Sequence, residues 1–209
     1  SIWTFVQPPK DWHIIDSKWV LRIKRDGNGN LIPLARVVAR VCSQVPGIDF
    51  QDTFSPTLNI CGFLMLVTLA AHDLEVHHLD VETTFLHEEL DDFFYPQPEF
   101  FKIQVIRHLF FLTHKSIYDL KQSPRIWYHK LHSFRIKVGY HHLNNEPNIY
   151  VRKAKSKFFI IDLYVDDLPL MPNYSKSYLT IITKELACVF PIIDLRPMTD
   201  FLGNQVIQN

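Results

Sequence analysis

Hydrophobic and polar residues alternate with a period of two near the N-terminus of the chain. Trp19, Leu21 and Ile23 recur at every second position, so they share one face of an extended strand. The following stretch, 26–30, is rich in Gly and Asn and has the composition of a turn, and a hydrophobic pattern resumes in 31–39. The pattern predicts a β-hairpin.

Three stretches have the composition and spacing of α-helices. Residues 59–73 are apolar over about four helical turns, which is too long for a strand and predicts a buried helix. Residues 123–139 begin with Ser123 as an N-cap before a proline, repeat hydrophobic side chains at helical spacing and end at Gly139. A further helix is expected within 174–190. We assign no chemistry to the first helix.

Carboxylates follow two apolar stretches that are typical of strands. Asp166 and Asp167 come after the run 158–163, and Asp80 comes directly after 74–79. Adjacent carboxylates at the end of a buried strand are costly unless a cation lies between them, and the natural counter-ion is a divalent metal. Three oxygen ligands on short side chains suit two Mg²⁺ ions that hold a nucleoside triphosphate and an attacking hydroxyl group.

Composition sets independent bounds on the class of protein. With 209 residues and 47% hydrophobic content, the chain can bury a substantial core as one domain or two closely joined lobes. No window approaches the ~20 uncharged apolar residues of a membrane span, and no signal peptide opens the chain, so we expect a soluble intracellular protein. The cysteines are three in number and far apart, which favours core thiols over a disulfide framework or a zinc site. They are Cys42, Cys61 and Cys188.

The formal net charge of zero hides a segregation of charge along the chain. Residues 1–50 hold seven Lys/Arg and four Asp/Glu, and residues 101–160 hold twelve Lys/Arg and two Asp/Glu. The other two segments are acidic: 51–100 has no Lys/Arg and ten Asp/Glu, and 161–209 has three Lys/Arg and six Asp/Glu. A protein that joins metal ions to a polyanion needs both kinds of segment. A solvated surface is the simpler interpretation for most of the lysines.

Seven blocks in one order are similar to the reverse transcriptase domain of copia-type long-terminal-repeat retrotransposons, and together they cover almost the whole chain. A Tyr-x-Asp-Asp string such as Tyr164-Val165-Asp166-Asp167 is weak evidence by itself, whereas seven ordered blocks are specific. The blocks are 17–26, 35–40, 47–50 with 53–56, 79–86, 116–128, 163–168 and 201–203.

The resemblance implies an α+β fold that resembles the fingers and palm of a right-hand polymerase, with an antiparallel palm sheet backed by helices. Residues 1–209 would form a single reverse transcriptase domain, with fingers at about 1–75 and the palm at about 76–209. The palm strands would lie near 74–81, near 157–165 and in a hairpin at Asp166. Thumb, ribonuclease H, integrase and protease segments would lie outside this chain, in the rest of a Pol polyprotein. Such a protein is expected in a cytoplasmic particle or the nucleus.

The activity that the resemblance implies is RNA-directed DNA polymerisation, in which a dNTP is joined to a primer on an RNA or DNA template. Asp80, Asp166 and Asp167 would be the catalytic residues and would hold two Mg²⁺, or Mn²⁺ in their place. One ion would lower the pKa of the primer 3′-hydroxyl, and the other would neutralise the leaving pyrophosphate. Lys121 and Arg125 would lie near backbone phosphates of the nucleic acid.

Four further residues are nucleotide-binding by resemblance. Phe85 matches an aromatic residue that packs under the sugar and excludes a 2′-hydroxyl. Arg36 and Arg40 match basic residues that meet the triphosphate, and an Arg fork suits phosphate oxygens. Gln122 matches a glutamine that faces the base and sugar. Without the resemblance, a core ring, a solvated strand face and a solvated residue before a helix are the simpler interpretations of these positions.

The chain also departs from the family pattern. Asp119 replaces a Gly that supplies positive φ, a conformation that Asp tolerates better than most residues but not freely, and its charge would lie near the nucleotide. Residues 101–115 match poorly, and local misfolding or decay is expected there. The other departures are Leu34, Val41, Cys42, Thr84, Phe100, Pro172 and Arg196.

These departures keep two other functions open. The first is a degenerate, non-catalytic transposon remnant that at most binds nucleic acid. The second is another two-metal phosphoryl-transfer enzyme on a palm-like sheet, such as a nucleotide cyclase. The cyclase hypothesis explains the carboxylates, but the chain has no Gly-rich signature and the block around Gln122 is left without a role.

Overall fold

The structure is a computed structural model of this chain and describes residues 3–8, 10–25, 29–57, 60–71, 76–87, 89–98, 102–154, 157–162, 167–172, 176–198, 200–201, 204–205 and 207. Contacts within the chain divide it into two compact units. Unit 1 comprises residues 1–54 and 85–127, and unit 2 comprises residues 55–84 and 128–209. Each unit therefore combines two separate stretches of the sequence.

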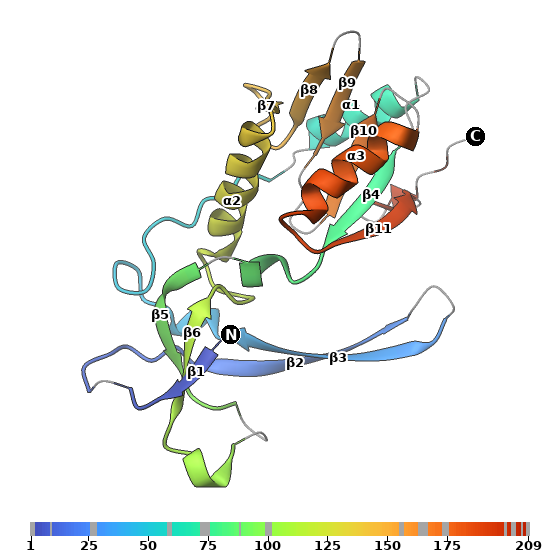
Figure 1. The fold of residues 1–209 in the computed structure, drawn as a ribbon. Coiled ribbons are helices and arrows are strands. Elements are labelled where there is room, and N and C mark those ends of the chain that lie inside the picture. The colour runs from blue at the N-terminus through green and yellow to red at the C-terminus, as the bar shows by residue number, and fades with distance from the viewer. Residues whose placement is uncertain are drawn as a thin grey trace. The chain divides into compact units, whose positions relative to one another are not determined.

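Unit 1 contains the predicted β-hairpin. β2 (Ser17–Arg25) and β3 (Leu31–Ala39) pair in antiparallel register over their whole length. Figure 1 shows them as a long two-stranded ribbon, coloured blue. Val38 is buried at the base of the hairpin, whereas Leu21 and Ile23 nearer its turn are 74% and 71% exposed. The period-two pattern thus predicted the strands correctly, although alternation did not here produce a covered apolar face.

A three-stranded antiparallel sheet forms the rest of the unit 1 framework. β6 (Phe110–Lys115) lies between β1 (Trp3–Val6) and β5 (Glu89–Tyr95). The misfolding expected in residues 101–115 is therefore wrong for β6, because this strand pairs with a neighbouring strand on both sides. The core beside this sheet contains Ile15, Ala39, Phe93, Tyr95, Ile117 and Leu120.

Unit 2 is built on a six-stranded antiparallel sheet with the strand order β11-β4-β10-β9-β8-β7. The sequence predicted the strands around β4, β9 and β10, and the structure adds the remaining three strands of this sheet. The strands are β4 (His77–Val81), β7 (His141–His142), β8 (Tyr150–Ala154), β9 (Lys157–Ile161), β10 (Asp167–Pro172) and β11 (Ile192–Pro197). A short pair, β12 (Asp200–Phe201) with β13 (Asn204–Gln205), follows.

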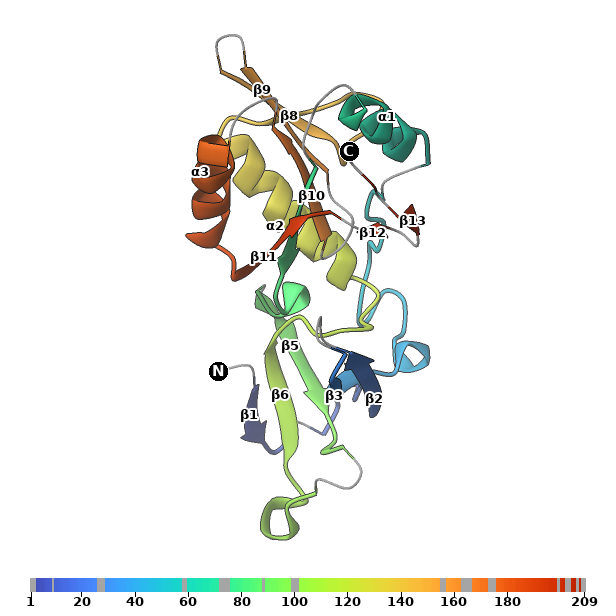
Figure 2. The ribbon, with the colours of Figure 1, turned by 90° about the vertical axis from the view of Figure 1, so that its right-hand side faces the viewer.

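Helices cover both faces of this sheet. Figure 2 shows α3 and the part of α2 from residue 128 onward on one face, and α1 on the other. On the α1 face, Ile160 of β9 and Met171 of β10 pack in one cluster with Phe63 of α1. Successive residues of a strand point to opposite faces, so the buried neighbours Ile161 and Leu170 show that the other face is covered as well. The bounds are α1 (Ile60–Ala70), α2 (Ser123–Lys137) and α3 (Lys176–Ala187).

The three predicted helices are confirmed within the described residues, and Gly139 ends the predicted helical stretch at φ 88°. None of the described helices is long and apolar enough to cross a membrane. The expectation that the cysteines are core thiols is wrong for Cys42 and Cys188, because both are exposed. Three 3-10 helices complete the described elements: η1 (Val41–Ser43), η2 (Thr84–His87) and η3 (Gln104–Ile106).

Candidate active site

Two of the three predicted catalytic carboxylates occupy paired positions in the unit 2 sheet. Asp80 lies within β4, one residue further into the strand than the sequence indicated, and is directly opposite Asp167, the first residue of β10. Asp80 is half-buried between the buried residues Leu79 and Val81. Asp166 lies outside the described residues. The fold therefore joins segments that are far apart in the sequence at one point of the sheet.

This pairing suits a hard divalent cation. Cα atoms of directly paired residues in antiparallel strands lie about 4.5 to 5.5 Å apart, and carboxylate oxygens are the ligands that Mg²⁺ prefers. Among the described residues, no group of three or more His, Cys, Asp or Glu side chains is arranged to hold a metal ion. Of the three predicted ligands, the structure therefore describes the side chain of Asp80 and the strand position of Asp167.

A buried arginine holds the strand that leads into the Tyr164–Asp167 segment. Arg135 of α2 is fully buried, and its Nη2 donates a hydrogen bond to the carbonyl oxygen of Asp162 at 3.4 Å. Its guanidinium carbon also lies 4.4 Å from the centroid of the Tyr150 ring. Burial lowers the pKa of Arg135 to about 10, and Coulombic interactions with Tyr150 and Asp162 oppose that shift. On the next strand, the carbonyl of Pro169 accepts a hydrogen bond from the Asp162 amide at 3.0 Å.

In unit 1, a tyrosine joins two of the predicted nucleotide-binding residues. The guanidinium carbon of Arg36 lies 4.5 Å from the centroid of the Tyr118 ring. The ring of Phe85 contacts the same tyrosine edge-on, with centroids 5.0 Å apart and an interplanar angle of 77°. Tyr118 lies in the matched block 116–128, but the resemblance implies no role for it. The available signal was an aromatic residue directly before the positive-φ position at Asp119.

The side chain of Gln122 belongs to a buried hydrogen-bond network. Its Oε1 accepts from Nε2 of Gln44 at 2.9 Å, and its own Nε2 donates to the carbonyl oxygen of Asp49 at 3.2 Å. Oε1 of Gln44 also accepts from the backbone amide of Lys121 at 2.9 Å. The Asp49 carboxylate lies 2.9 Å from His13 Nδ1. These bonds fix the turn before α2, and sequence reasoning missed Gln44 and Asp49 because they lie more than 70 positions away.

The other predicted basic residues have partners in unit 1. Arg40 pairs with Asp16 at 3.4 Å, and Arg125 pairs with Asp52 at 3.2 Å. The Lys121 ammonium lies 4.6 Å from the centroid of the Phe50 ring. Exposed ion pairs of this kind are worth about 0 to 1 kcal/mol, so phosphate could displace the carboxylates at little cost.

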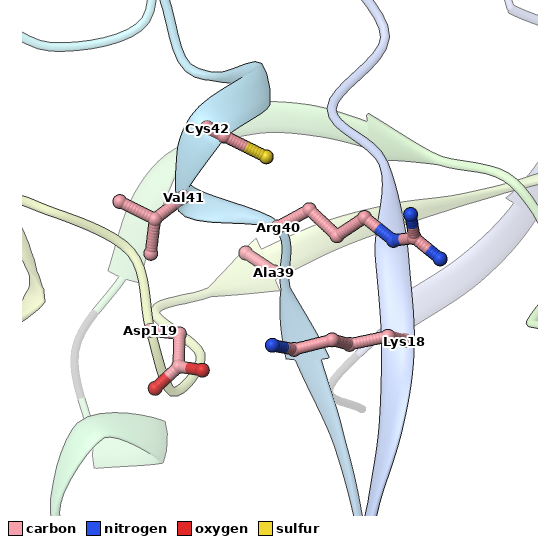
Figure 3. Close-up of a pocket in the computed structure, with 6 residues that line it drawn as sticks. All are labelled: Lys18, Ala39, Arg40, Val41, Cys42 and Asp119. Atoms are coloured by element: carbon pink, nitrogen blue, oxygen red, sulfur yellow. The ribbon is translucent and has the colours of Figure 1, made fainter.

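A pocket of about 300 Å³ lies beside Asp119. Its walls include Lys18, Arg40, Cys42 and Asp119. In Figure 3 the ammonium end of Lys18 points toward Asp119, whereas the guanidinium of Arg40 points away from it. Asp119 has φ 68°, which confirms the expected left-handed conformation at this position. Asp119 therefore lines a pocket in which the Lys18 ammonium points toward it.

The chain belongs to the reverse transcriptase (RNA-dependent DNA polymerase) family, which it matches over residues 1–209. The predicted resemblance to copia-type retrotransposon Pol polyproteins is confirmed by its relatives. It is 36% identical over 207 residues to the retrovirus-related Pol polyprotein from transposon TNT 1-94 of Nicotiana tabacum, covering 97% of this chain and 16% of that protein.

Two further relatives extend the comparison. The chain is 28% identical over 205 residues to the Pol polyprotein from transposon RE1 of Arabidopsis thaliana, which covers 96% of this chain and 14% of that protein. It is 27% identical over 182 residues to the truncated transposon Ty1-A Gag-Pol polyprotein of Saccharomyces cerevisiae, which covers 82% of this chain and 14% of that protein. The chain thus spans less than one fifth of the length of these relatives.

Proposed function

We propose that the chain forms the fingers and palm of an RNA-directed DNA polymerase that works as part of a retrotransposon Pol polyprotein inside the cell. The observation that carries this proposal is the register of β4 and β10, which sets Asp80 opposite Asp167. Family membership supplies the reaction class. The substrates would be dNTPs and a primer on an RNA or DNA template.

Asp80, Asp166 and Asp167 would act as metal ligands at the paired strands. When bound, two Mg²⁺ ions, or Mn²⁺ in their place, would stabilise the attacking primer oxygen and the leaving pyrophosphate. The three negatively charged carboxylates would bind these cations and fix their positions. The hydrogen bonds of Asp162 to Arg135 and Pro169 hold the residue that follows β9.

The unit 1 residues would bind the substrates. Arg36 and Arg40 would meet triphosphate oxygens, and Phe85 would exclude a ribose 2′-hydroxyl. Lys121 and Arg125 would follow the nucleic-acid backbone, where Asp52 now neutralises Arg125. Gln122 stays a proposed nucleotide contact of the family pattern, although its amide already bonds to other groups in unit 1.

The second candidate function is a degenerate remnant that at most binds nucleic acid. The observation that favours it is Asp119, whose carboxylate lies in a pocket beside Lys18 and Arg40. A negative charge there would repel a triphosphate and would reduce the effect of the nearby cations. The two candidates therefore differ in catalysis and share the fold.

Mg²⁺-dependent incorporation of dTTP on poly(rA)/oligo(dT) tests the proposal. We expect the parent chain to incorporate dTTP. The incorporation rate of Asp80→Asn should be at least about 100-fold lower, because a lost metal ligand removes several kcal/mol of transition-state stabilisation. Asp194→Asn is the matched control, since Asp194 is an exposed carboxylate on β11, the other neighbour of β4. Undiminished incorporation by Asp80→Asn contradicts the proposed site, and a folded parent without incorporation supports the remnant.

A further inference from the structure

We propose that Tyr118 is the positioning residue that sets nucleotide selection in this chain, by holding both the Arg36 guanidinium and the Phe85 ring. The inference rests on the proposed function and deepens it. The new element is the role of Tyr118 in that selection, which the proposed function assigned to Phe85 and Arg36. It also gives a role to a residue that the resemblance left without one.

Tyr118 contacts the other two residues through different parts of its ring. The Arg36 guanidinium lies over the ring face at 4.5 Å from the centroid, where the negative part of the aromatic quadrupole attracts a cation. Phe85 approaches at 77° with centroids 5.0 Å apart, which is the edge-to-face arrangement that aromatic pairs prefer. One ring therefore restrains both neighbours at once.

Arg36 is available for an anionic substrate in a way that the other predicted arginines are not. Arg40 and Arg125 pair with carboxylates, whereas Arg36 forms no ion pair with another residue in the described part of the chain. Stacking on a ring leaves the N–H groups of a guanidinium free at its edges, and these groups match phosphate oxygens in pairs. Tyr118 would thus hold a preorganised phosphate fork.

The backbone around Tyr118 keeps its ring in place. Its carbonyl oxygen accepts a hydrogen bond from the Ala39 amide at 3.2 Å, which ties this turn to the end of β3. Phe85 is buried, with 8% of its surface exposed. A ring that excludes a 2′-hydroxyl must resist displacement by that extra oxygen, and a stiff edge contact supplies this resistance. Removal of the Tyr118 ring would therefore loosen the sugar filter as well as the phosphate fork.

Equilibrium binding of radiolabelled dTTP and UTP tests the proposal without requiring catalysis. The full chain is mixed with poly(rA)/oligo(dT) and Ca²⁺, and the dissociation constants are compared among the parent, Tyr118→Leu and Tyr118→Phe. We expect Tyr118→Leu to raise the dissociation constant of dTTP roughly 5- to 10-fold. The dissociation constant of UTP divided by that of dTTP should fall at least about 3-fold. Tyr118→Phe keeps the ring, and both constants should stay within about 2-fold of the parent.

The ratio of the two constants separates positioning from a general loss of structure. Partial unfolding would weaken the binding of both nucleotides equally and would leave the ratio of their dissociation constants unchanged. Trp12→Leu is the matched control, because Trp12 makes a similar edge-on contact with Phe94 in the same unit, at 4.9 Å. Thermal melts report folding, and Tyr118→Met replaces Tyr118→Leu if the latter does not fold.

The outcomes also separate this inference from the proposed activity. A parent that prefers dTTP and loses this preference in Tyr118→Leu, yet incorporates nothing when Mg²⁺ replaces Ca²⁺, supports the role of Tyr118 and contradicts the polymerase. An unchanged UTP/dTTP ratio in the folded Tyr118→Leu chain overturns the inference. A parent that binds neither nucleotide overturns it too, since no site is then present for Tyr118 to organise.

Discussion

At the residue scale, Asp119 adopts the left-handed backbone conformation although Gly, the residue of the family pattern, suits that conformation better. Its φ of 68° lies in the left-handed region, which Gly adopts freely and other residues adopt at a cost of roughly 1 to 2 kcal/mol. Asp is among the residues that tolerate this region best. The same carboxylate also lines the pocket that contains Lys18. One residue therefore imposes a conformational cost and an electrostatic cost at the same turn.

Asp119→Gly should relieve both costs. We expect the free energy of unfolding to change by less than about 1 kcal/mol, because the gain in backbone fit is offset by the larger entropy of Gly in the unfolded chain. Nucleotide incorporation should rise several-fold, because the repelling charge is removed. Urea unfolding and primer extension measure the two effects. Asp11→Gly, at an exposed carboxylate elsewhere in unit 1, is the control and should not raise incorporation.

If Asp119→Gly leaves incorporation at the parental level, Asp119 is not the residue that limits activity. If both chains incorporate nothing while Asp119→Gly is folded, the remnant hypothesis gains support from a second, independent variant.

At the element scale, helix α2 is linked to the hairpin of β9 and β10 by a buried pair of opposite charge. Arg135 and Asp162 are both fully buried, and the structure joins them through the 3.4 Å bond to the Asp162 carbonyl. Burying charges costs several kcal/mol per ion unless partners compensate for the lost hydration. Because the Asp162 charge raises the pKa of Arg135 against the effect of burial, we expect each charge to depend on the other.

Single and double substitutions should show this dependence. Arg135→Met leaves the Asp162 carboxylate without its buried cation and should lower the free energy of unfolding by about 3 to 5 kcal/mol. Asp162→Leu should be similarly costly for the converse reason. The double variant Arg135→Met/Asp162→Leu should recover most of the loss, because apolar side chains of similar volume replace the pair. Denaturant unfolding of the four chains measures the coupling, and additive losses would contradict it.

At the scale of the whole molecule, charge that is segregated along the sequence becomes mixed within each unit. Unit 1 contains twelve Lys/Arg and eleven Asp/Glu, whereas unit 2 contains ten and eleven. Each unit combines a basic stretch with an acidic one. A polyanion would therefore meet local basic surfaces, above all along residues 101–150, and not a uniformly positive molecule.

Binding to an RNA/DNA hybrid should consequently depend strongly on salt and little on sequence. If about four basic side chains from 101–150 contact phosphates, affinity should fall about 100-fold between 50 and 200 mM salt. Lys137→Gln, at an exposed position near the end of α2, should reduce the slope by about one contact. Lys10→Gln, outside this stretch, should not. Fluorescence anisotropy at several salt concentrations measures the slope, and an affinity independent of salt would show these charges to be ordinary solvated surface.

Local patterns in the sequence determined most elements of this protein. Alternation predicted the hairpin of β2 and β3, and apolar length predicted α1, because these signals depend on neighbouring residues alone. Ordered motif blocks identified the family and pointed to Asp80 and Asp167. Residues 101–115 were misjudged because the pairing of β6 depends on β1, over 100 residues earlier in the chain.

Tertiary structure alone decided which side chains meet. Gln122 matched a nucleotide-facing position, yet its partners Gln44 and Asp49 lie 78 and 73 positions away. Tyr118 carried no periodic signal of its role, because that role follows from contacts with Arg36 on β3 and Phe85 in η2. Secondary structure follows from local backbone and hydrophobic preferences, whereas a site requires non-local contacts that form only when the chain closes long loops. The sequence therefore determined the family and the elements, and the fold determined the partners of each site residue.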